Sequence, residues 1–488
     1  MVMSLKDKTI AGLKWSFIDS FANQGIQFII GIVLARLLSP REFGLIGIIT
    51  VFIALSQSFV NSGFSQALIR KNDCTQEDYC TVFYFNMMVG ILFYNVLFLS
   101  AGPIAKFFKE PQLFLLIRIL GINVIIICIG LIQRTILIKR INFRLQAKIS
   151  IISTAASGIL AIWLAYNGWG VWSLVWKVLC QNLITTFFLW IWNRWMPILT
   201  FSISSFRKLF DFGSKLLATG LIDTAYRNIY YLVIGKFFSA AELGYYTRAD
   251  EFSNMPSANL CTIVGRVAYP ALATVQDDNQ KLKVGFKKLI KSIMLISFVL
   301  MIGMAAVAKP MILTLVGEKW LPSVTNLQLL CFVGMLFPLH GLNLDILLIK
   351  GRSDLFLRLE IIKKLLAVPV IISGVFFGIK IMITAMFILS CTAYFLNSYW
   401  SGRLIDYTMR EQVMDILPSF LIALIMGIVV FAIGHFLIFS QIIILSIQII
   451  SGALITISIA RIIRLDSFME IKEILLQNLM TIRSKRNI

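Results

Sequence analysis

The sequence predicts an all-α polytopic membrane protein with about fourteen transmembrane helices, in two six-helix lobes of a pseudo-symmetric repeat followed by a C-terminal helix pair. Of the 488 residues, 58% are hydrophobic and 14% are charged, and the mean hydropathy is +0.85. These values are far from those of soluble proteins. Apolar stretches of roughly 20 residues recur along the chain, and each can cross the roughly 30 Å hydrocarbon core of a bilayer.

A loop between two apolar stretches occurs twice. The segment from Arg36 to Gly44 reappears from Lys236 to Gly244, with a matching cation, two large apolar residues, Ser, Glu, a further apolar residue and Gly. Such duplication is usual in transporters whose binding site lies between two halves. We expect the glycines to permit a tight turn between helices and the serines to cap the following helix, and we interpret the glutamates as structural.

The apolar stretches divide the chain into two halves and an additional pair. The expected spans of the first half are residues 13–36, 43–66, 80–101, 113–136, 145–166 and 169–191. Those of the second half are 211–235, 244–272, 287–307, 323–349, 356–379 and 381–402, and the pair is 414–437 and 441–460. Because the stretches are continuously apolar and do not alternate, they exclude a transmembrane β-barrel.

These spans predict the domain organisation. The predicted parts are an N-terminal six-helix lobe at 1–192, a cytoplasmic linker with an interfacial helix at 193–210, a C-terminal six-helix lobe at 211–403, an extra helix pair at 404–462 and a cytoplasmic tail at 463–488. The first helix is too long and too polar for a secretory signal.

The net charge of +21 follows from the distribution of 45 Lys and Arg. Most of these cations lie in alternate loops, such as 134–148, 281–291 and 350–364, whereas the turn at 167–170 has no charge. This asymmetry predicts that both termini are cytoplasmic. A nucleic-acid partner is excluded because no soluble domain is present to carry one.

The sequence offers no motif for common enzyme chemistry. The seven cysteines suggest neither a disulfide framework nor a zinc site, and the only histidines are His340 and His435. Nucleotide, metalloprotease and acyl-transfer motifs are absent, so we expect no cofactor and no metal. The short outer loops leave no room for a catalytic domain, which favours transport over catalysis.

Three segments carry a family resemblance: residues 266–289, Gly317 to Trp320, and Leu327 to Gly334, together with the repeated loop. They resemble Wzx-like flippases of the polysaccharide transport family, of the colanic-acid and teichuronic-acid type, within the multidrug/oligosaccharidyl-lipid/polysaccharide superfamily. The resemblance implies a V-shaped central cavity, alternating access and a bacterial inner-membrane location. It also implies an undecaprenyl-diphosphate-linked oligosaccharide as substrate, for lipopolysaccharide or other surface polysaccharide, and a polysaccharide polymerase as a candidate partner.

A lipid-diphosphate headgroup needs cations and hydrogen-bonding groups on otherwise apolar helix faces. Polar strips of this kind occur on the first two helices of each half. The candidate substrate-binding residues are Arg227, Lys177, Arg266, Asn23, Gln27, Gln57, Asn61 and Asn254.

Arg227 lies near the middle of its expected helix, where an uncompensated Arg costs on the order of 3 kcal/mol. Asp223 lies four residues earlier, so the two could form a structural salt bridge. The alternative is that Arg227 contacts the substrate or takes part in coupling. Lys177 is the second candidate for the diphosphate, and Arg266 either reaches the headgroup region or lines the cavity.

Transport without ATP requires coupling to an ion gradient or to the membrane potential. The candidate ion-coupling carboxylates are Asp19, Asp223, Asp250 and Glu251. The alternative for Asp250 and Glu251 is that they are solvated charges near the outer end of their helix. We expect Asp345 to pair with Lys350 or Arg352.

Two other functions stay open. A cation-coupled drug antiporter of the same superfamily would be expected to have an acidic cavity with few buried Arg. A membrane enzyme or scaffold of a glycan pathway is the third interpretation, and the short loops weaken it.

Overall fold

The structure is a computed structural model that describes residues 5–61, 63–71, 73–263, 265, 268–470 and 472–473. Throughout these residues the chain forms helices and connecting turns, without a β-strand. The chain divides into two compact units, Met1–Gly244 and Tyr245–Ile488. The lobe, linker and tail boundaries expected from the sequence stay predictions.

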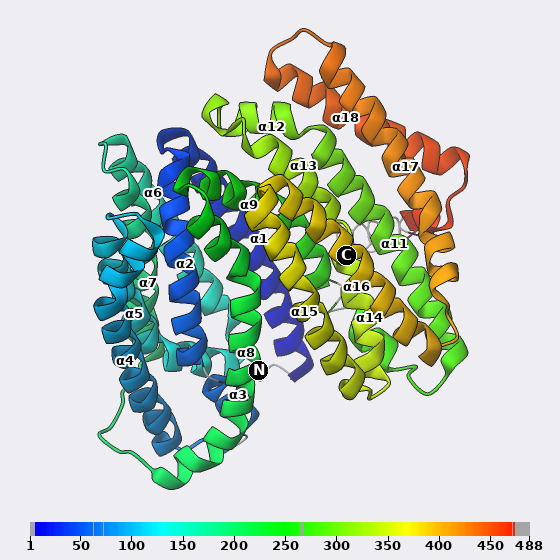
Figure 1. Cartoon of the computed structure of the whole chain (residues 1–488). Helices are drawn as coiled ribbons and strands as arrows, with labels where there is room; N and C mark the ends of the chain where they lie inside the picture. Colours follow the sequence, from blue (N-terminus) through cyan, green and yellow to red (C-terminus); the bar gives the residue numbers. More distant parts are fainter. Residues whose placement is uncertain are drawn as a thin grey trace, which may run out of the picture. The chain divides into compact units, whose positions relative to one another are not determined.

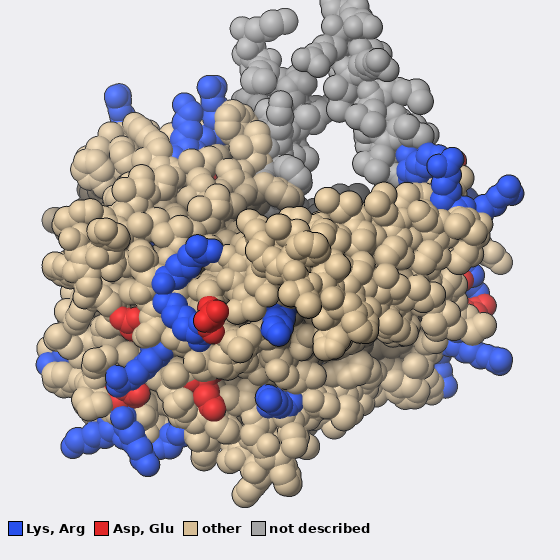
Figure 2. All heavy atoms as spheres, turned by 90° about the horizontal axis from the view of Figure 1, so that it is seen from above, with Lys and Arg blue, Asp and Glu red and all other residues tan. Residues whose placement is uncertain are grey.

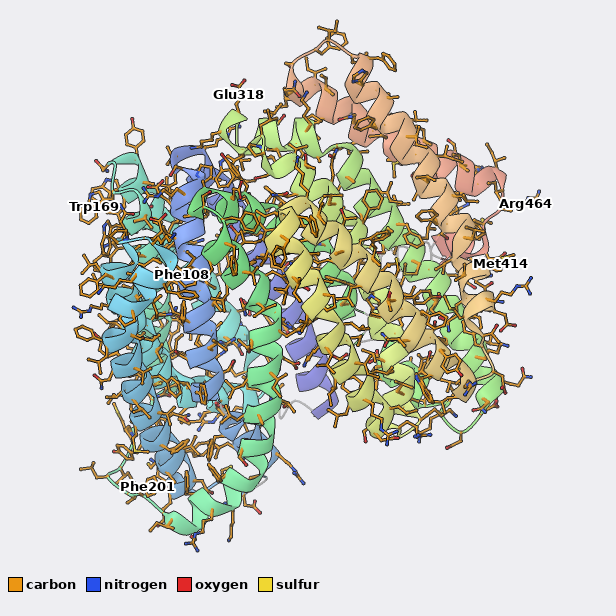
Figure 3. All side chains as sticks on the ribbon, viewed as in Figure 1. Phe108, Trp169, Phe201, Glu318, Met414 and Arg464 are labelled. Carbon is orange, nitrogen blue, oxygen red and sulfur yellow. The ribbon has the colours of Figure 1, made fainter. Side chains whose placement is uncertain are left out.

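The first unit is built from long helices that pack side by side (Figure 1). They are α1 (Leu5–Leu37), α2 (Pro40–Asn61), α3 (Phe64–Arg70), α4 (Gln76–Phe108), α5 (Leu113–Lys139), α6 (Phe143–Tyr166), α7 (Val171–Asn193) and α8 (Ile203–Phe237). The most extensive contacts are those of α4 with α5, α1 with α6, α6 with α7, and α5 with α7, and α2 also packs along α8. In Figure 3, Trp169 in the α6–α7 turn and Phe201 before α8 lie at opposite ends of this unit.

Helix α9 (Ala240–Ile263) begins in the first unit and continues into the second. The second unit then contains α10 (Tyr269–Ala273), α11 (Asn279–Ala306), α12 (Ala308–Leu315), a 3₁₀ turn at Glu318–Trp320, α13 (Ser323–Gly334), α14 (Phe337–Ile349), α15 (Ser353–Phe377), α16 (Ile379–Leu404), α17 (Met409–Phe436) and α18 (Gln441–Ile462). Here α11 packs along α17, α15 along α16, and α17 along α18.

Eleven segments of the described chain are long and apolar enough to cross a membrane. Helices α8, α9 and α15 are also long, with 35, 24 and 25 residues, but they are not among the eleven. On the face in Figure 2, Lys and Arg form separate groups between wide areas without charge. The protein is therefore an all-helical, multi-pass membrane protein, as expected, and the count of fourteen spans stays a prediction.

Two expected spans are interrupted. Residues 43–66 are divided between α2 and α3, because Gly63 adopts a left-handed φ of 71° that a continuous helix does not allow. Residues 323–349 are divided between α13 and α14, and Pro338 lies in the first turn of α14, where its missing N–H costs least.

The segment from residue 193 to residue 210 packs against the first unit. The Trp195 indole N–H donates to Gln76 Oε1 at 2.8 Å, and the Ser202 N–H donates to Thr81 Oγ1 at 3.0 Å. Phe206 stacks on Phe64 with 5.8 Å between ring centroids. The segment expected to be an interfacial helix therefore forms the first turns of α8, and its aromatic side chains are held by α3 and α4.

The repeated loop is a helix start in both copies. Ser39 N–H donates to the Glu42 carboxylate at 2.6 Å, and Glu242 N–H donates to Ser239 Oγ at 3.1 Å. Each copy thus shows one half of a capping box. The interpretation of Glu42 as structural is supported, because its carboxylate accepts from Ser39, and Ser239 caps its helix as expected. The structural interpretation of the Glu242 side chain stays a prediction.

The two glycines of the repeat do not form turns, contrary to expectation. Gly44 and Gly244 lie inside α2 and α9, and neither has a positive φ. A Cβ on Gly44 would lie 1.7 Å from the Ala240 carbonyl oxygen, and one on Gly244 would lie 1.8 Å from that of Pro40. All four residues belong to the first unit. The glycines are needed because two helix starts touch backbone to backbone, in a small-xxx-small arrangement.

Candidate functional site

A chain of polar side chains crosses α1, α6 and α7 at a level where their neighbours are apolar. Asn23 donates from Nδ2 to Ser150 Oγ at 2.7 Å and accepts at Oδ1 from Thr154 Oγ1 at 2.6 Å. Gln181 Nε2 donates to Thr154 Oγ1 at 3.1 Å, and Gln27 Nε2 reaches Asn23 Oδ1 at 3.5 Å. The structure therefore brings two candidate residues of α1 together with three residues that the sequence reasoning missed.

Asp19 lies one turn before Asn23 on α1. Its carboxyl group interacts with the Ser150 hydroxyl, and its Oδ1 is buried without a hydrogen-bond partner in the described part of the chain. A buried carboxylate oxygen beside hydroxyl and amide oxygens can bind a proton or a hard monovalent cation. Lys177 is half-buried on α7, one turn before Gln181, and it has an interaction partner.

The missed residues left a signal in the sequence. Ser150 and Thr154 are four residues apart in the apolar helix α6, so they lie on one face of it. The expected polar strips lie on the first two helices of each half, with Lys177 as the one candidate on a later helix of the first half, so this face of α6 is not among them.

A second polar region lies where α2 packs along α8. The hydroxyls of Ser58 and Thr224 are 2.7 Å apart and join the two helices. Gln57 is half-buried beside Ser58. The backbone of Asn61 ends α2, but its side chain lies outside the described residues.

Arg227 and Asp223 are both exposed on α8. Among the described residues, no ion pair joins these two side chains, and Asp223 has another interaction. The salt bridge considered from the sequence is therefore not formed here. Arg227 lies ten residues before the end of α8, which is about 15 Å along the helix axis and about half of the hydrocarbon thickness.

The polar residues of α9 interact with one another in two pairs. Arg248 is 4% exposed and pairs with Glu251 at 2.8 Å, and its guanidinium also lies 5.6 Å from the Trp320 ring. Asn254 Nδ2 donates to Asp250 Oδ1 at 2.7 Å. Three candidate residues are thus in contact with neighbours on their own helix, and Glu251 balances the charge of a buried Arg that the candidate set omitted.

Two further expectations can be compared with the structure. Arg266 lies outside the described residues. The expected pairing of Asp345 is wrong, because Lys350 Nζ bonds Asn279 Oδ1 at 2.6 Å and Arg352 pairs with Asp354 at 2.9 Å. The hydrogen bond from Arg352 lowers the pKa of the Asp354 carboxyl to about 2. Arg352 therefore pairs with Asp354, two residues along the chain, and not with Asp345.

No cluster of three or more His, Cys, Asp or Glu that could hold a metal ion occurs in the described ranges. The helices are long enough to cross a membrane, and they carry polar side chains between them and a cation at mid-helix depth. These features are typical of a multi-pass membrane transporter. The fold is similar to that of the lipid II flippase MurJ in an inward closed conformation. The TM-score is 0.78 at 15% identity, over 93% of this chain and 99% of that one.

Comparison of sequences identifies the family. Residues 33–325 match the family model described as polysaccharide biosynthesis protein. The teichuronic acid biosynthesis protein TuaB of Bacillus subtilis (strain 168) is 30% identical, over 88% of this chain and 90% of its own length. The lipopolysaccharide biosynthesis protein WzxC of Escherichia coli (strain K12) is 28% identical, over 88% and 89%. The chain belongs to this polysaccharide biosynthesis family and is a Wzx-like flippase.

Proposed function

We propose that the protein moves an undecaprenyl-diphosphate-linked oligosaccharide from the cytoplasmic to the outer leaflet of the bacterial inner membrane by alternating access. The family and the relatives, which are named for surface polysaccharide pathways, support this substrate class. The observation that carries the proposal furthest is Arg227, an exposed cation at mid-helix depth in α8 without an ion pair among described residues.

A cation at this depth needs an anion or water. An uncompensated Arg costs on the order of 3 kcal/mol in the middle of a membrane helix. A diphosphate can accept two parallel N–H bonds from a guanidinium, and Arg is suited to this contact because its donors form a rigid fork. The lipid diphosphate would therefore supply the anionic partner with which Arg227 forms no ion pair among the described residues.

The remaining candidates are assigned by their contacts. Lys177 on α7 is the second residue proposed for the diphosphate, with Gln57, Asn61, Asn254 and Arg266 for its oxygens or the sugar hydroxyls. Both polar atoms of Asn23 are already used within the first unit, so we assign Asn23, supported by Gln27, to positioning Ser150, which in turn contacts Asp19.

Asp19 is the proposed coupling site because its Oδ1 is buried without a hydrogen-bond partner in the described residues. A proton or a monovalent cation would satisfy that oxygen. Asp223, Asp250 and Glu251 are secondary candidates. Helices α8, α9 and α15 are long enough to add three spans to the eleven, which gives the proposed fourteen. An even number of spans places both termini on the same side, which we propose is the cytoplasm.

The proposed reaction is a movement without bond chemistry, so no enzyme activity is assigned. A polysaccharide polymerase is the class of partner that would use the substrate after it reaches the outer leaflet. A cation-coupled drug antiporter is disfavoured, because the exposed Arg227 would repel a cationic drug.

The decisive experiment measures the leaflet in which the lipid-linked oligosaccharide accumulates. We expect depletion of the protein to retain the oligosaccharide in the inner leaflet, detected as loss of labelling by a membrane-impermeant glycan reagent in spheroplasts. An unchanged leaflet distribution would contradict the flippase assignment. Drug accumulation, measured in the same cells, should not change, and a change there alone would favour the antiporter.

A further inference from the structure

Five lysines lie in the first turns of α11: Lys281, Lys283, Lys287, Lys288 and Lys291. The helix has 28 residues and is about 42 Å long, which exceeds the roughly 30 Å hydrocarbon core. Its residues from 292 onward carry no charge, and the roughly 20 residues needed to cross the core, counted back from Ala306, reach Lys287. Lys287, Lys288 and Lys291 therefore lie at the boundary of the hydrocarbon core, where long cationic side chains extend to the lipid headgroups.

One group of contacts on this face is tight and structural. Asp415 of α17 is 13% exposed and pairs with Lys287 at 2.9 Å and with Lys291 at 3.4 Å. The Tyr407 hydroxyl also donates to Asp415 at 2.7 Å. A mostly buried carboxylate with three donors fixes α17 against α11.

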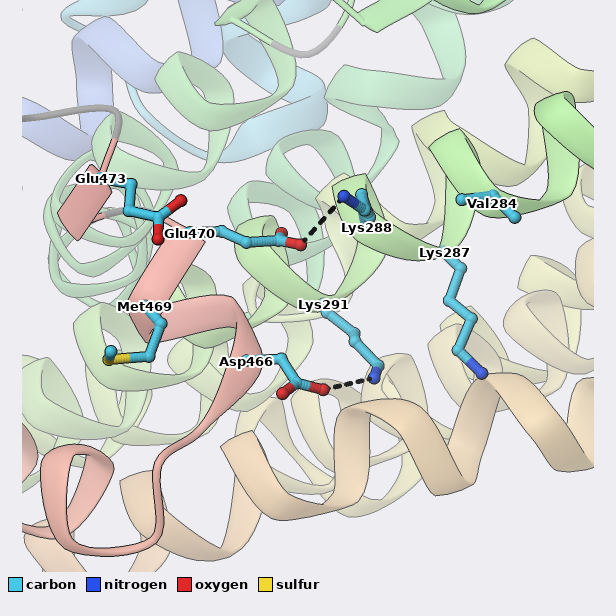
Figure 4. A pocket seen from close by; sticks show the side chains of 8 residues that line it. All are labelled: Val284, Lys287, Lys288, Lys291, Asp466, Met469, Glu470 and Glu473. Atoms are coloured by element: carbon cyan, nitrogen blue, oxygen red, sulfur yellow. Dashed lines mark hydrogen bonds and ion pairs between the residues drawn. The ribbon is translucent and has the colours of Figure 1, made fainter. Parts of the chain in front are cut away.

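A second group of contacts is loose. Lys288 pairs with Glu470 at 3.4 Å, and Lys291 pairs with Asp466 at 3.5 Å (Figure 4). Lys288 is 64% exposed and Asp466 is 80% exposed. Exposed ion pairs contribute about 0–1 kcal/mol each, because water and salt screen them. These two ion pairs can therefore open at little cost, and the segment after α18 is also held by Ser467, which is 2% exposed.

A pocket of about 380 Å³ lies between the lysines of α11 and the segment after α18. Its lining combines three lysines, three carboxylates and two apolar side chains: Val284, Lys287, Lys288, Lys291, Asp466, Met469, Glu470 and Glu473. Val284 is 53% exposed and Met469 is 40% exposed. With Asp466, Glu470 and Glu473 in place the lining is formally neutral. Without them the three lysines face a single carboxylate, Asp415, so a formal charge of about +2 stays beside apolar side chains.

Cations next to exposed apolar groups at headgroup level suit a charged lipid. A carboxylate and a phosphate offer similar anionic oxygens to an ammonium group. We propose that Lys288 and Lys291 form a binding site for the phosphate of an anionic phospholipid headgroup, and that the acidic residues Asp466 and Glu470 compete for it. Lipid occupancy would release the segment 466–470 from α11.

The first arm of the test removes the lysines. The double variant K288Q/K291Q is compared with K281Q, because Lys281 is on the same helix but outside the pocket. Phosphatidylglycerol bound to the purified protein is measured by native mass spectrometry, with phosphatidylcholine as the neutral lipid. We expect roughly tenfold weaker phosphatidylglycerol binding in K288Q/K291Q and little change in K281Q. Equal binding in the two variants would overturn the proposal.

The second arm removes the competing carboxylates. D466N/E470Q should bind phosphatidylglycerol more tightly than the parent, and a matched control is D277N, because Asp277 is exposed just before α11 and outside the pocket. No gain over D277N would contradict competition by the segment. Inorganic phosphate is the third arm: equal retention of phosphate and phosphatidylglycerol would show an ion site and overturn the lipid assignment. Circular dichroism confirms that each variant is folded.

Discussion

Arg227 lies ten residues before the end of α8 and is exposed. If it holds the substrate diphosphate, R227A should lower export at least tenfold while leaving expression unchanged, because a lost charge-assisted bidentate contact is worth about 1.5–3 kcal/mol. Export is measured as surface polysaccharide per unit of protein in the membrane.

The matched control for R227A is R207A, since Arg207 is exposed in the first turns of the same helix. R227K separates charge from geometry: a bidentate role predicts only partial rescue. Wild-type export in R227A would remove Arg227 from the substrate path.

Asn23 tests whether the polar network is structural. N23A removes one hydrogen-bond partner from each of Ser150 and Thr154, so we expect a loss of about 1–3 kcal/mol in the free energy of unfolding. Thermal unfolding of purified protein measures it. N167A is the control, because Asn167 donates only to a carbonyl of its own helix. Equal stability of N23A and N167A would show that the network contributes little.

Part of this site could be predicted from the sequence. Asp19, Asn23 and Gln27 share a helix face, which the spacing shows directly. Their partners on α6 and α7 could not be predicted, since Ser150 is 127 residues from Asn23 and only packing brings them together. Similarly, the Asp223–Arg227 spacing permits a salt bridge, but side-chain directions in the folded helix decide whether it forms.

At the scale of the element, the contact between the starts of α2 and α9 gives a sharp prediction. G44A and G244A should each destabilise the protein by about 1–3 kcal/mol, because the new methyl group would overlap a backbone carbonyl. The controls are G25A and G220A, where a Cβ meets nothing within 4 Å. These controls should be neutral or stabilising, since Ala favours a helix over Gly.

Thermal unfolding distinguishes these variants, and export shows whether the contact also matters for transport. The double variant G44A/G244A should cost less than the sum of its parts, because both substitutions disrupt one contact. If G44A were as stable as G25A, the close approach of the two helix starts would be contradicted.

The repeated loop was found from the sequence, but the prediction that Gly44 and Gly244 form a turn was wrong. A Gly after a Ser-x-x-Glu pattern is compatible with a turn and with a close helix crossing, and only the neighbouring backbone distinguishes them. The segment 204–210 has basic and aromatic residues that suit a membrane surface, and Phe206 packs on Phe64 of the first unit. Its interfacial position stays a prediction.

For the whole molecule, the charge asymmetry of the loops predicts that both termini are cytoplasmic. In a variant without native cysteines, N167C should react with a membrane-impermeant maleimide in intact cells, because the 167–170 turn is expected outside. R140C, in a cation-rich loop, should react only after permeabilisation. The reverse pattern would invert the predicted topology.

The sequence by itself determined the membrane class, most helices and the family, because hydrophobic length and local motifs are properties of contiguous residues. The tertiary structure alone decided which polar groups meet. Asn23 with Ser150 and Thr154, Arg248 with Trp320, and Gly44 with the Ala240 carbonyl depend on packing between helices or across turns. The spacing of residues along one helix shows which of them share a face, but only the packed helices show which residues of another helix that face meets.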